Sequence, residues 1–240
     1  KKLNFMKIKK AVILSAGYGK RLNPITLSKP KPLIEINNTT LLENTIVTLE
    51  QMGIEEIVIN THYLSKQIEE FIKNKKFESK ISLRYEDEKI LDTGGGVLNA
   101  AKKFKNDPFF VFNPDTVWSK NYLKDFKNME ELYMNKNCKA VLLVVHKKKS
   151  FDKTMLGDFN MKENFISRDD GDNNYIYTGS QIMNNSAFGD RKIDSFSMNI
   201  IWDLLIKNEE LMGVENDKEF FHVSNLKIYK ELMKKNLIFK

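Results

Sequence analysis

Short, unbroken apolar runs that alternate with amphipathic segments constrain the fold of this chain most strongly. The runs show no strict polar alternation, which is typical of strands that are buried on both faces. Strands are expected at 10–15, 55–60, 81–86, 108–113 and 140–145. Helical periodicity predicts helices between them, at 38–52, at 64–74, after Gly96 and at 120–135.

This alternation predicts parallel βαβ units with helices on both faces of one sheet. We therefore expect a doubly wound, mostly parallel α/β fold over the first 150 residues. The later segments GDFNM, NFISR and YIYTGSQIM are shorter, and helices are expected at about 196–207 and 224–236. They predict small antiparallel additions that complete a single domain over 1–240, with parts of about 1–150 and 151–240.

Charge and composition limit the classes of partner. The formal charge of +7 favours anionic partners, but the lysines are spread along the chain and no RNP-type or zinc-finger pattern occurs, so no nucleic acid partner is expected. No run of about 18 apolar residues is present and the start KKLNFMKIKK is too polar for a signal peptide, so we expect no membrane association and a cytoplasmic location. Cys138 is the only cysteine and is interpreted as an inert strand residue.

The loop after the first strand, LSAGYGKRLNPITLSKPKPL (14–33), is the first place to look for a ligand site, because parallel sheets bind ligands at the carboxyl ends of their strands. Leu22 stands where the dinucleotide-binding fingerprint needs its third glycine. The loop also has no G-K-[ST], so it is not a P-loop. Neither standard phosphate-binding motif fits.

The composition of this loop nevertheless suits a phosphate. Gly17 and Gly19 let backbone N–H groups approach an anion, and Lys20, Arg21 and Lys31 add positive charge. A solvated basic loop with turn glycines is the alternative at this point.

The pattern L-S-A-G-x-G-x-R-L-x-P-x-T-x-x-x-P-K-P-L resembles the signature of the sugar-1-phosphate nucleotidyltransferases, also called nucleoside-diphosphate-sugar pyrophosphorylases. The resemblance continues through LLENTIVTLEQMGIEEIVIN, LDTGGGVLNA, FFVFNPD and YTGSQIM, and so covers nearly the whole chain. The short length, T-G-G-G and L-G-D-F are most similar to the N-acetylmuramate α-1-phosphate uridylyltransferases of cell-wall recycling. This implies a Rossmann-like nucleotidyltransferase fold with a nucleotide-binding first part and a sugar-binding second part.

The resemblance implies a set of nucleotide-binding positions in two segments. The triphosphate would be held by Ala16, Gly17, Gly19, Lys20, Arg21 and Lys31. Gly94 would lie near the base, and Asp87 stands at the position of a polar base-reading side chain. From the residues alone, the glycines of LDTGGGVLNA precede a helix and either pass close to a flat ligand or form a loose turn and N-cap.

Asp115 ends the FFVFNPD strand, where its carboxylate either holds Mg²⁺ or forms an Asx turn. The resemblance favours the metal role, although Pro114 replaces the usual glycine. Asn113 is similar to the family asparagine that contacts the sugar, and its alternative is a strand-end hydrogen bond. Metal binding is thus expected at the end of this strand.

Three further positions resemble residues that face the sugar in the uridylyltransferases: Gly157, Asp158 and Gly179. A carboxylate accepts hydrogen bonds from sugar hydroxyls or an amide, but all three residues also suit ordinary turns. No E-K-P segment is present, so no lysine is evident for the sugar phosphate.

The main departure from the family is EFFHVSN, which places His222 where many relatives have the second metal-binding aspartate. Imidazole is a poorer Mg²⁺ ligand than carboxylate. The residues leave four alternatives open: a metal contact through water, a preference for Mn²⁺, a direct phosphate contact, or a packed strand histidine.

The expected reaction joins a nucleoside monophosphate from an NTP to a sugar 1-phosphate, with release of pyrophosphate. Arg21, Lys31 and Asp115 are the expected catalytic residues, and Asp115 with His222 the expected metal site for Mg²⁺, or Mn²⁺. UTP and N-acetylmuramate 1-phosphate are the first choice of substrates, and mannose-1-phosphate guanylyltransferase is the alternative. A nucleotide-sugar-binding regulator without turnover is a third reading. We expect a monomer or small homo-oligomer.

Overall fold

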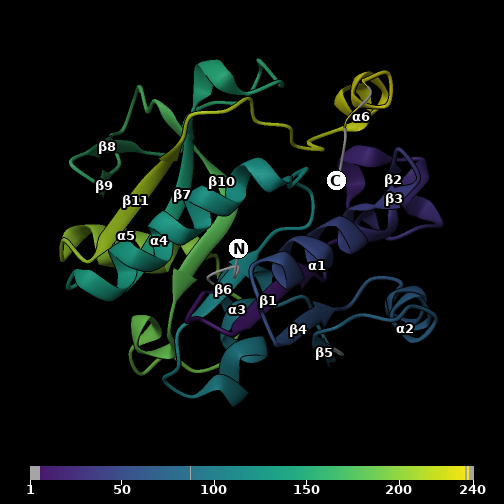
Figure 1. Ribbon diagram of the computed structural model, residues 1–240, viewed down its shortest axis with the longest axis horizontal. Coiled ribbons are helices and arrows are strands. Elements are labelled where there is room, and N and C mark those ends of the chain that lie inside the picture. The colour runs from purple at the N-terminus through teal and green to yellow at the C-terminus, as the bar shows by residue number, and fades with distance from the viewer. Residues whose placement is uncertain (1–5, 87, 236, 238–240) are drawn as a thin grey trace, which may run out of the picture.

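The computed structural model describes residues 6–86, 88–235 and 237 of the chain. Within them the main sheet has nine strands in the order β5-β4-β1-β6-β10-β7-β11-β9-β8 (Figure 1). The strands are β1 (Lys10–Ser15), β4 (Glu56–Thr61), β5 (Lys80–Tyr85), β6 (Phe109–Phe112), β7 (Ala140–His146), β8 (Asn160–Lys162), β9 (Phe165–Ser167), β10 (Tyr175–Met183) and β11 (Leu211–Asn216). The expected α/β fold with a mostly parallel sheet and small antiparallel additions is confirmed.

The apolar runs occupy the centre of the sheet. β1 pairs in parallel with β4 on one side and with β6 on the other, and Ala11, Val12 and Ile13 are fully buried. Because both faces of β1 are covered, its apolar residues need not alternate with polar ones. The five strands expected in the first 150 residues all form, with ends shifted by no more than one residue.

Helices cover both faces of the sheet, as a doubly wound fold requires. Apolar residues of α1 (Leu41–Gln51), α2 (Ser65–Lys73) and α4 (Leu123–Asn135) pack on one face. Those of α3 (Asp92–Ala101) and α5 (Met198–Lys207) pack on the other. In Figure 1, α1 and α4 lie in front of the sheet and α3 lies behind β1 and β6.

The first helix begins later than its periodicity predicts. The chain before it forms the hairpin β2 (Glu35–Ile36) and β3 (Thr39–Thr40), and Thr40 caps the helix by accepting a hydrogen bond from the Glu43 N–H at 3.0 Å. Helix α6 (Leu226–Leu232) lies beside this hairpin although it comes from the other end of the chain (Figure 1). The Tyr229 hydroxyl donates to the Glu35 carbonyl at 3.0 Å.

The second part of the chain enters the middle of the sheet. β10 lies between β6 and β7 and runs antiparallel to both, so the strands of the first part are not contiguous. β11 pairs in parallel with β7 and was not expected from the sequence. Its glycine, Gly213, and its polar end make LMGVEN a weak strand signal.

The glycine run of LDTGGGVLNA lies inside α3, so the expectation that the glycines precede the helix is wrong. A Cβ at Gly94 would lie 2.4 Å from Cε2 of Phe196, and one at Gly95 would lie 1.9 Å from the Asp194 carbonyl oxygen. The amides of Gly94 and Gly95 both donate to the Phe196 carbonyl, at 2.9 and 3.1 Å. The glycines thus admit a neighbouring backbone segment, which also caps the first turn of the helix.

Cys138 lies two residues before β7, so the expectation that it is a strand residue is wrong. Its thiol is unpaired and half-buried, and burial raises the pKa of the thiol to about 11. This agrees with the expected lack of reactivity. Among the described residues, none of the helices has the length and apolar character that crossing a bilayer needs.

Candidate active site

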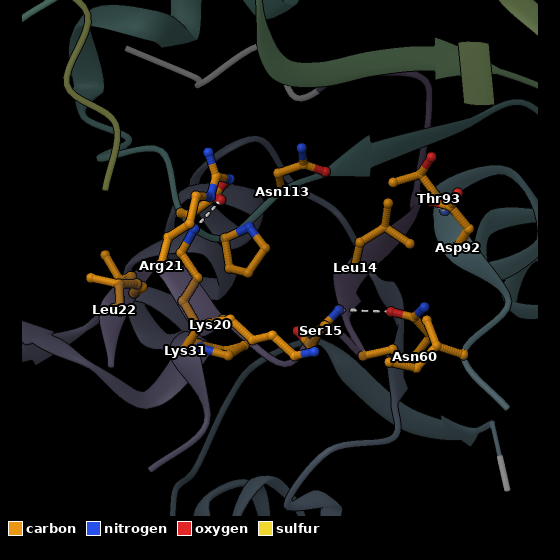
Figure 2. Close-up of a pocket in the computed structure, with 18 residues that line it drawn as sticks. Leu14, Ser15, Lys20, Arg21, Leu22, Lys31, Asn60, Asp92, Thr93 and Asn113 are labelled. Atoms are coloured by element: carbon orange, nitrogen blue, oxygen red, sulfur yellow. Dashed lines mark hydrogen bonds and ion pairs between the residues drawn. The ribbon is translucent and has the colours of Figure 1, made fainter. Parts of the chain in front are cut away.

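A cavity of about 420 Å³ opens at the carboxyl ends of β1, β4 and β6. This is the edge where the topology of an open parallel sheet places a ligand. Figure 2 shows Lys20, Arg21 and Lys31 on one side of it and Asn60, Asp92 and Thr93 on the other. Its lining is formed by Leu14, Ser15, Ala16, Gly17, Gly19, Lys20, Arg21, Leu22, Lys31, Pro32, Leu41, Asn60, Ile90, Asp92, Thr93, Asn113, Pro114 and Asp115. All six residues expected to hold the triphosphate are among them.

The loop after β1 is shaped by a left-handed glycine and a buried threonine. Gly19 has φ +66°, and a Cβ there would lie 3.0 Å from both Lys31 and Thr26 side-chain atoms. The Thr26 hydroxyl is 3.0 Å from the Gly19 carbonyl oxygen and 2.8 Å from Oδ1 of Asn23. A 3₁₀ turn at Lys31–Leu33 then directs Lys31 back to the cavity.

The positive side chains of the loop differ in their surroundings. Lys20 and Arg21 are exposed and neither forms an ion pair with any carboxylate of the described residues. Lys31 is largely buried and its Nζ lies 2.6 Å from Oδ2 of Asp115. Among the described residues the loop therefore presents two exposed cations without an ion pair, Lys20 and Arg21, and one buried cation, Lys31, that is paired.

Asp115 receives contacts from two sides. Nε2 of His222 lies 3.1 Å from the same Oδ2 that binds Lys31. Burial alone would raise the pKa of Asp115, but the charges and hydrogen bonds of Lys31 and His222 outweigh it and hold the pKa well below its usual range. Because the Val223 N–H donates to the Asp115 carbonyl at 2.8 Å, the 220s segment is fixed against the end of β6.

The donor set at Asp115 fits a divalent cation. Oδ1 of Asp115 is buried and has no hydrogen-bond partner in the described part of the chain, and a carboxylate oxygen is the ligand that Mg²⁺ prefers. Within the described residues, no group of three or more His, Cys, Asp or Glu could enclose a metal ion. The protein can thus offer Asp115, with His222 beside it, while phosphate oxygens and water would complete the coordination of such an ion.

His222 lies beside Asp115, close to the expected metal position. Its ring stacks on Phe220 at an interplanar angle of 8°, and its buried Nδ1 has no hydrogen-bond partner among the described residues. The His222 side chain therefore packs against Phe220 and also contacts the carboxylate of Asp115.

The opposite side of the cavity is built on Asn60 at the end of β4. Its Oδ1 accepts the Ser15 N–H at 2.7 Å, and its Nδ2 donates to Oε1 of Glu86 at 2.7 Å. Gly94 does not line the cavity, whereas the neighbouring Thr93 does. Asp87 lies outside the described residues.

Asn113 lines the cavity, and Gly179 supports it from the neighbouring strand. The Asn113 N–H donates to the Gly179 carbonyl at 2.7 Å. Gly179 has φ +97°, and a Cβ there would lie 2.9 Å from Cβ of Asn113. Glycine at 179 is thus needed for the backbone conformation and for the close approach of β10 to Asn113.

Gly157 and Asp158 do not line this cavity. A Cβ at Gly157 would lie 2.0 Å from the Asn173 carbonyl oxygen, so this glycine lies tightly against another loop. Asp158 retains solvent exposure but is crowded by protein atoms, which raises the pKa of its carboxyl, partly offset by the Tyr177 N–H that it accepts at 2.8 Å.

The sequence did not point to Asn60, Glu86 or Tyr177. The buried Tyr177 hydroxyl has no hydrogen-bond partner within the residues that the structure describes, and burial together with the charges of Asp115 and Asp158 raises its pKa. A signal for the first two was present, because Asn60 and Glu86 both stand at the end of an expected strand, as Asn113 does. Tyr177 lies within an apolar strand and has no such signal.

An open α/β sheet that holds a basic glycine loop and a carboxylate in one cavity at the carboxyl ends of its strands is typical of nucleotide-binding α/β enzymes. A model of the family described as nucleotidyl transferase matches residues 10–157. The chain belongs to this nucleotidyl transferase family, as the sequence motifs led us to expect.

Two named relatives are similar to the chain in different ways. The N-acetylmuramate α-1-phosphate uridylyltransferase of Caulobacter vibrioides is 24% identical over 221 residues, which cover 90% of this chain and 91% of that enzyme. The probable mannose-1-phosphate guanylyltransferase 1 of Oryza sativa subsp. japonica is 36% identical over 114 residues, 45% of this chain. The chain spans only about a third (31%) of the length of that guanylyltransferase.

Solved structures share the fold across nearly the whole chain. The inositol-1-phosphate CTP transferase of T. maritima superposes with a TM-score of 0.78 at 17% identity, covering 98% of this chain and 100% of the other. The fold is therefore that of the nucleotidyltransferases.

Proposed function

We propose that this protein transfers a nucleoside monophosphate from an NTP to a sugar 1-phosphate and releases pyrophosphate. The observation that carries the proposal is the cavity that brings together the glycine loop, Arg21 and the ion pair of Lys31 with Asp115. Membership of the nucleotidyl transferase family supports the reaction class. Positive charge together with a buried carboxylate in one cavity suits a triphosphate that is bound with a divalent cation.

The chemistry requires no general base from the protein. The second pKa of a phosphate monoester is about 6, so the acceptor phosphate is largely dianionic at neutral pH. Its oxygen forms a bond with the α-phosphorus of the NTP as the bond between the α-phosphorus and the bridging oxygen breaks. The electron pair leaves with pyrophosphate, so catalysis consists of positioning and charge neutralisation.

Each basic residue has a distinct part in this reaction. Arg21 and the amides around Gly17 and Gly19 hold the β- and γ-phosphates that leave as pyrophosphate. Lys31 neutralises charge that develops around the α-phosphorus. Mg²⁺, or Mn²⁺, held by Asp115 with His222 beside it, would supply Lewis-acid neutralisation of phosphate charge when bound.

We infer UTP and N-acetylmuramate 1-phosphate as the substrates, which would place the reaction in cell-wall recycling. The alignment with the Caulobacter uridylyltransferase over 90% of this chain supports this choice. Transfer of GMP to mannose 1-phosphate is the second candidate, favoured by the higher local identity of 36% to the rice guanylyltransferase. Asn113, Gly157, Asp158 and Gly179 are the residues proposed for the sugar side, and Gly94 and Asp87 for the base side.

A substrate panel tests the proposal. UTP, GTP, dTTP and CTP are each paired with N-acetylmuramate 1-phosphate and with mannose 1-phosphate, and pyrophosphate release is measured with Mg²⁺ and with Mn²⁺. The proposed activity predicts release with one base and one sugar preferred. Binding of an NDP-sugar with no pyrophosphate release under any metal would instead favour a regulator without turnover.

A further inference from the structure

A buried carboxylate outside the phosphate chemistry lies behind Asn60, which lines the cavity. Glu86 follows β5 and is 3% exposed, and both of its carboxylate oxygens are engaged. Oε1 accepts from Nδ2 of Asn60 at 2.7 Å, and Oε2 accepts from the Leu91 N–H at 2.8 Å. Glu86 thereby joins the end of β4 to the segment that leads into α3.

This pair fixes the orientation of the Asn60 amide. The Ser15 N–H is a donor, so it must face the oxygen of the amide, and the Glu86 carboxylate must face its nitrogen. A flipped amide would place donor against donor at Ser15 and acceptor against acceptor at Glu86. Figure 2 shows the amide oxygen of Asn60 toward Ser15 and the amide nitrogen on the side of Asp92 and Thr93.

Asn60 is 2% exposed and lines the cavity. Its oxygen accepts a hydrogen bond from the Ser15 N–H, and one of its two N–H groups donates to Glu86. The second N–H therefore remains as a donor for a ligand. The same side of the cavity carries Asp92 and Thr93, while Lys20, Arg21 and Lys31 of the basic loop lie opposite (Figure 2).

The third glycine of α3 is explained by the same pair. A Cβ at Gly96 would lie 2.7 Å from Nδ2 of Asn60 and 3.0 Å from Oε1 of Glu86. The helix therefore lies directly against the hydrogen bond between them, and a side chain at 96 would displace it.

We propose that Glu86 is a positioning residue that holds Asn60 as a hydrogen-bond donor to an acceptor atom of the nucleobase. This rests on the proposed nucleotidyl transfer and goes beyond it, because it assigns one direction of hydrogen bonding to the base side of the site. The ligand class is a nucleoside triphosphate whose base presents a carbonyl oxygen or ring nitrogen at this point.

The test compares Glu86→Gln with a matched buried glutamate. Glutamine keeps the size of Glu86 but replaces one acceptor with a donor, so either Asn60 or the Leu91 N–H loses its partner. Glu130→Gln is the control. Glu130 lies on α4, is 7% exposed and accepts a hydrogen bond from the Ile8 N–H at 2.7 Å, but it does not line the cavity. Wild type and both variants are measured for the KM of the NTP, the KM of the sugar 1-phosphate and kcat.

The expected result for Glu86→Gln is a KM for the NTP raised about 10-fold or more, since an unsatisfied buried donor costs on the order of one to two decades in an equilibrium constant. The KM of the sugar 1-phosphate and kcat should stay within about twofold, and discrimination among the four NTPs should weaken. Glu130→Gln should leave every kinetic constant near its wild-type value. An equal rise in the KM of both substrates, or an unchanged KM for the NTP, would overturn the proposal.

The variant Gly96→Ala is a second test of the Asn60–Glu86 contact, and it leaves every polar group in place. Alanine favours helix over glycine, so any weakening of NTP binding must come from displacement of the Asn60–Glu86 contact. Isothermal titration with a non-hydrolysable NTP analogue should show weaker binding by Gly96→Ala and Glu86→Gln, and wild-type affinity in either would contradict the proposal. A wild-type protein that binds no NTP would instead refute the proposed function itself.

Discussion

Lys31 and Asp115 are 84 residues apart in sequence and form a largely buried ion pair of 2.6 Å where the first loop meets the end of β6. A phosphate that enters the cavity therefore competes with Asp115 for the Lys31 ammonium. The pair keeps both charges at the reaction centre and avoids an isolated buried charge, which would be costly.

Loss of either partner of this pair should nearly abolish turnover. Lys31→Ala and Asp115→Ala are each expected to lower the rate of pyrophosphate release by about 100-fold or more, as is typical of one preorganised charged group. Lys29→Ala is the matched control from the same loop, because Lys29 is exposed, pairs with Glu35 at 3.5 Å and does not line the cavity. Near-normal rates in Lys31→Ala would refute the assigned mechanism.

Asp152 should contribute stability that disappears in acid. Burial would raise the pKa of its carboxyl, but hydrogen bonds from Ser224 at 2.5 Å and from the Thr154 hydroxyl at 2.6 Å outweigh burial and lower the pKa. A depressed pKa in the folded state means that the contribution is complete above the unfolded pKa of about 4 and is lost as pH falls through the folded value.

Asp152→Asn should therefore lower the free energy of unfolding by about 1–3 kcal/mol at pH 7. Urea titrations at pH 7 and near pH 3 measure this, and the gap between wild type and variant should narrow at the lower pH. A difference in the free energy of unfolding that grows at the lower pH would show that the pKa of Asp152 is raised by folding and not lowered.

Gly94 should be intolerant of even one methyl group. A Cβ at this position would lie 2.4 Å from Phe196, and overpacking of this kind costs about 1–3 kcal/mol despite the better helix propensity of alanine. Gly171→Ala is the control, since a Cβ at Gly171 meets no atom within 4 Å. Thermal unfolding should show a lower Tm for Gly94→Ala alone, and equal Tm values would contradict the packing described for α3.

The thiol of Cys138 should react slowly while the protein is folded. A pKa of about 11 leaves roughly 200-fold less thiolate at pH 8 than the ordinary thiol pKa of about 8.5. Labelling with a thiol-specific disulfide reagent should therefore be slow in buffer and fast in concentrated urea. Equal rates in the two conditions would show that the half-buried position does not protect the thiol.

The sequence predicted the parallel part of the sheet well, because local composition decides it. β1 and β4 each contain an unbroken apolar run, and the helices α1 and α2 each have one apolar stripe. The type of these elements and their order along the chain therefore follow from the hydrophobic pattern alone. The boundaries of α1 and α3 were less accurate. Tertiary contacts, namely the β2–β3 hairpin and the 194–196 segment, set where those helices begin.

Pairing across long sequence distances could not be read in the same way. Nothing in YIYTGSQIM indicates that it inserts between β6 and β7, because strand order depends on which edges are free and not on the strand's own residues. Tyr177 was missed for the same reason, since its position near Asp115 follows only from that insertion. The loop residues Arg21 and Lys31, by contrast, were found from the motif and do line the cavity.

The place of β10 has a consequence for the order in which the protein is made. β6 and β7 leave the ribosome before the strand that joins them, so until Met183 has emerged each presents an unpaired edge to its surroundings. A chain cut after residue 157 would keep both edges open permanently. Truncation there is thus a route to aggregation, and the nascent chain has most need of a chaperone during the interval between its seventh and tenth strands.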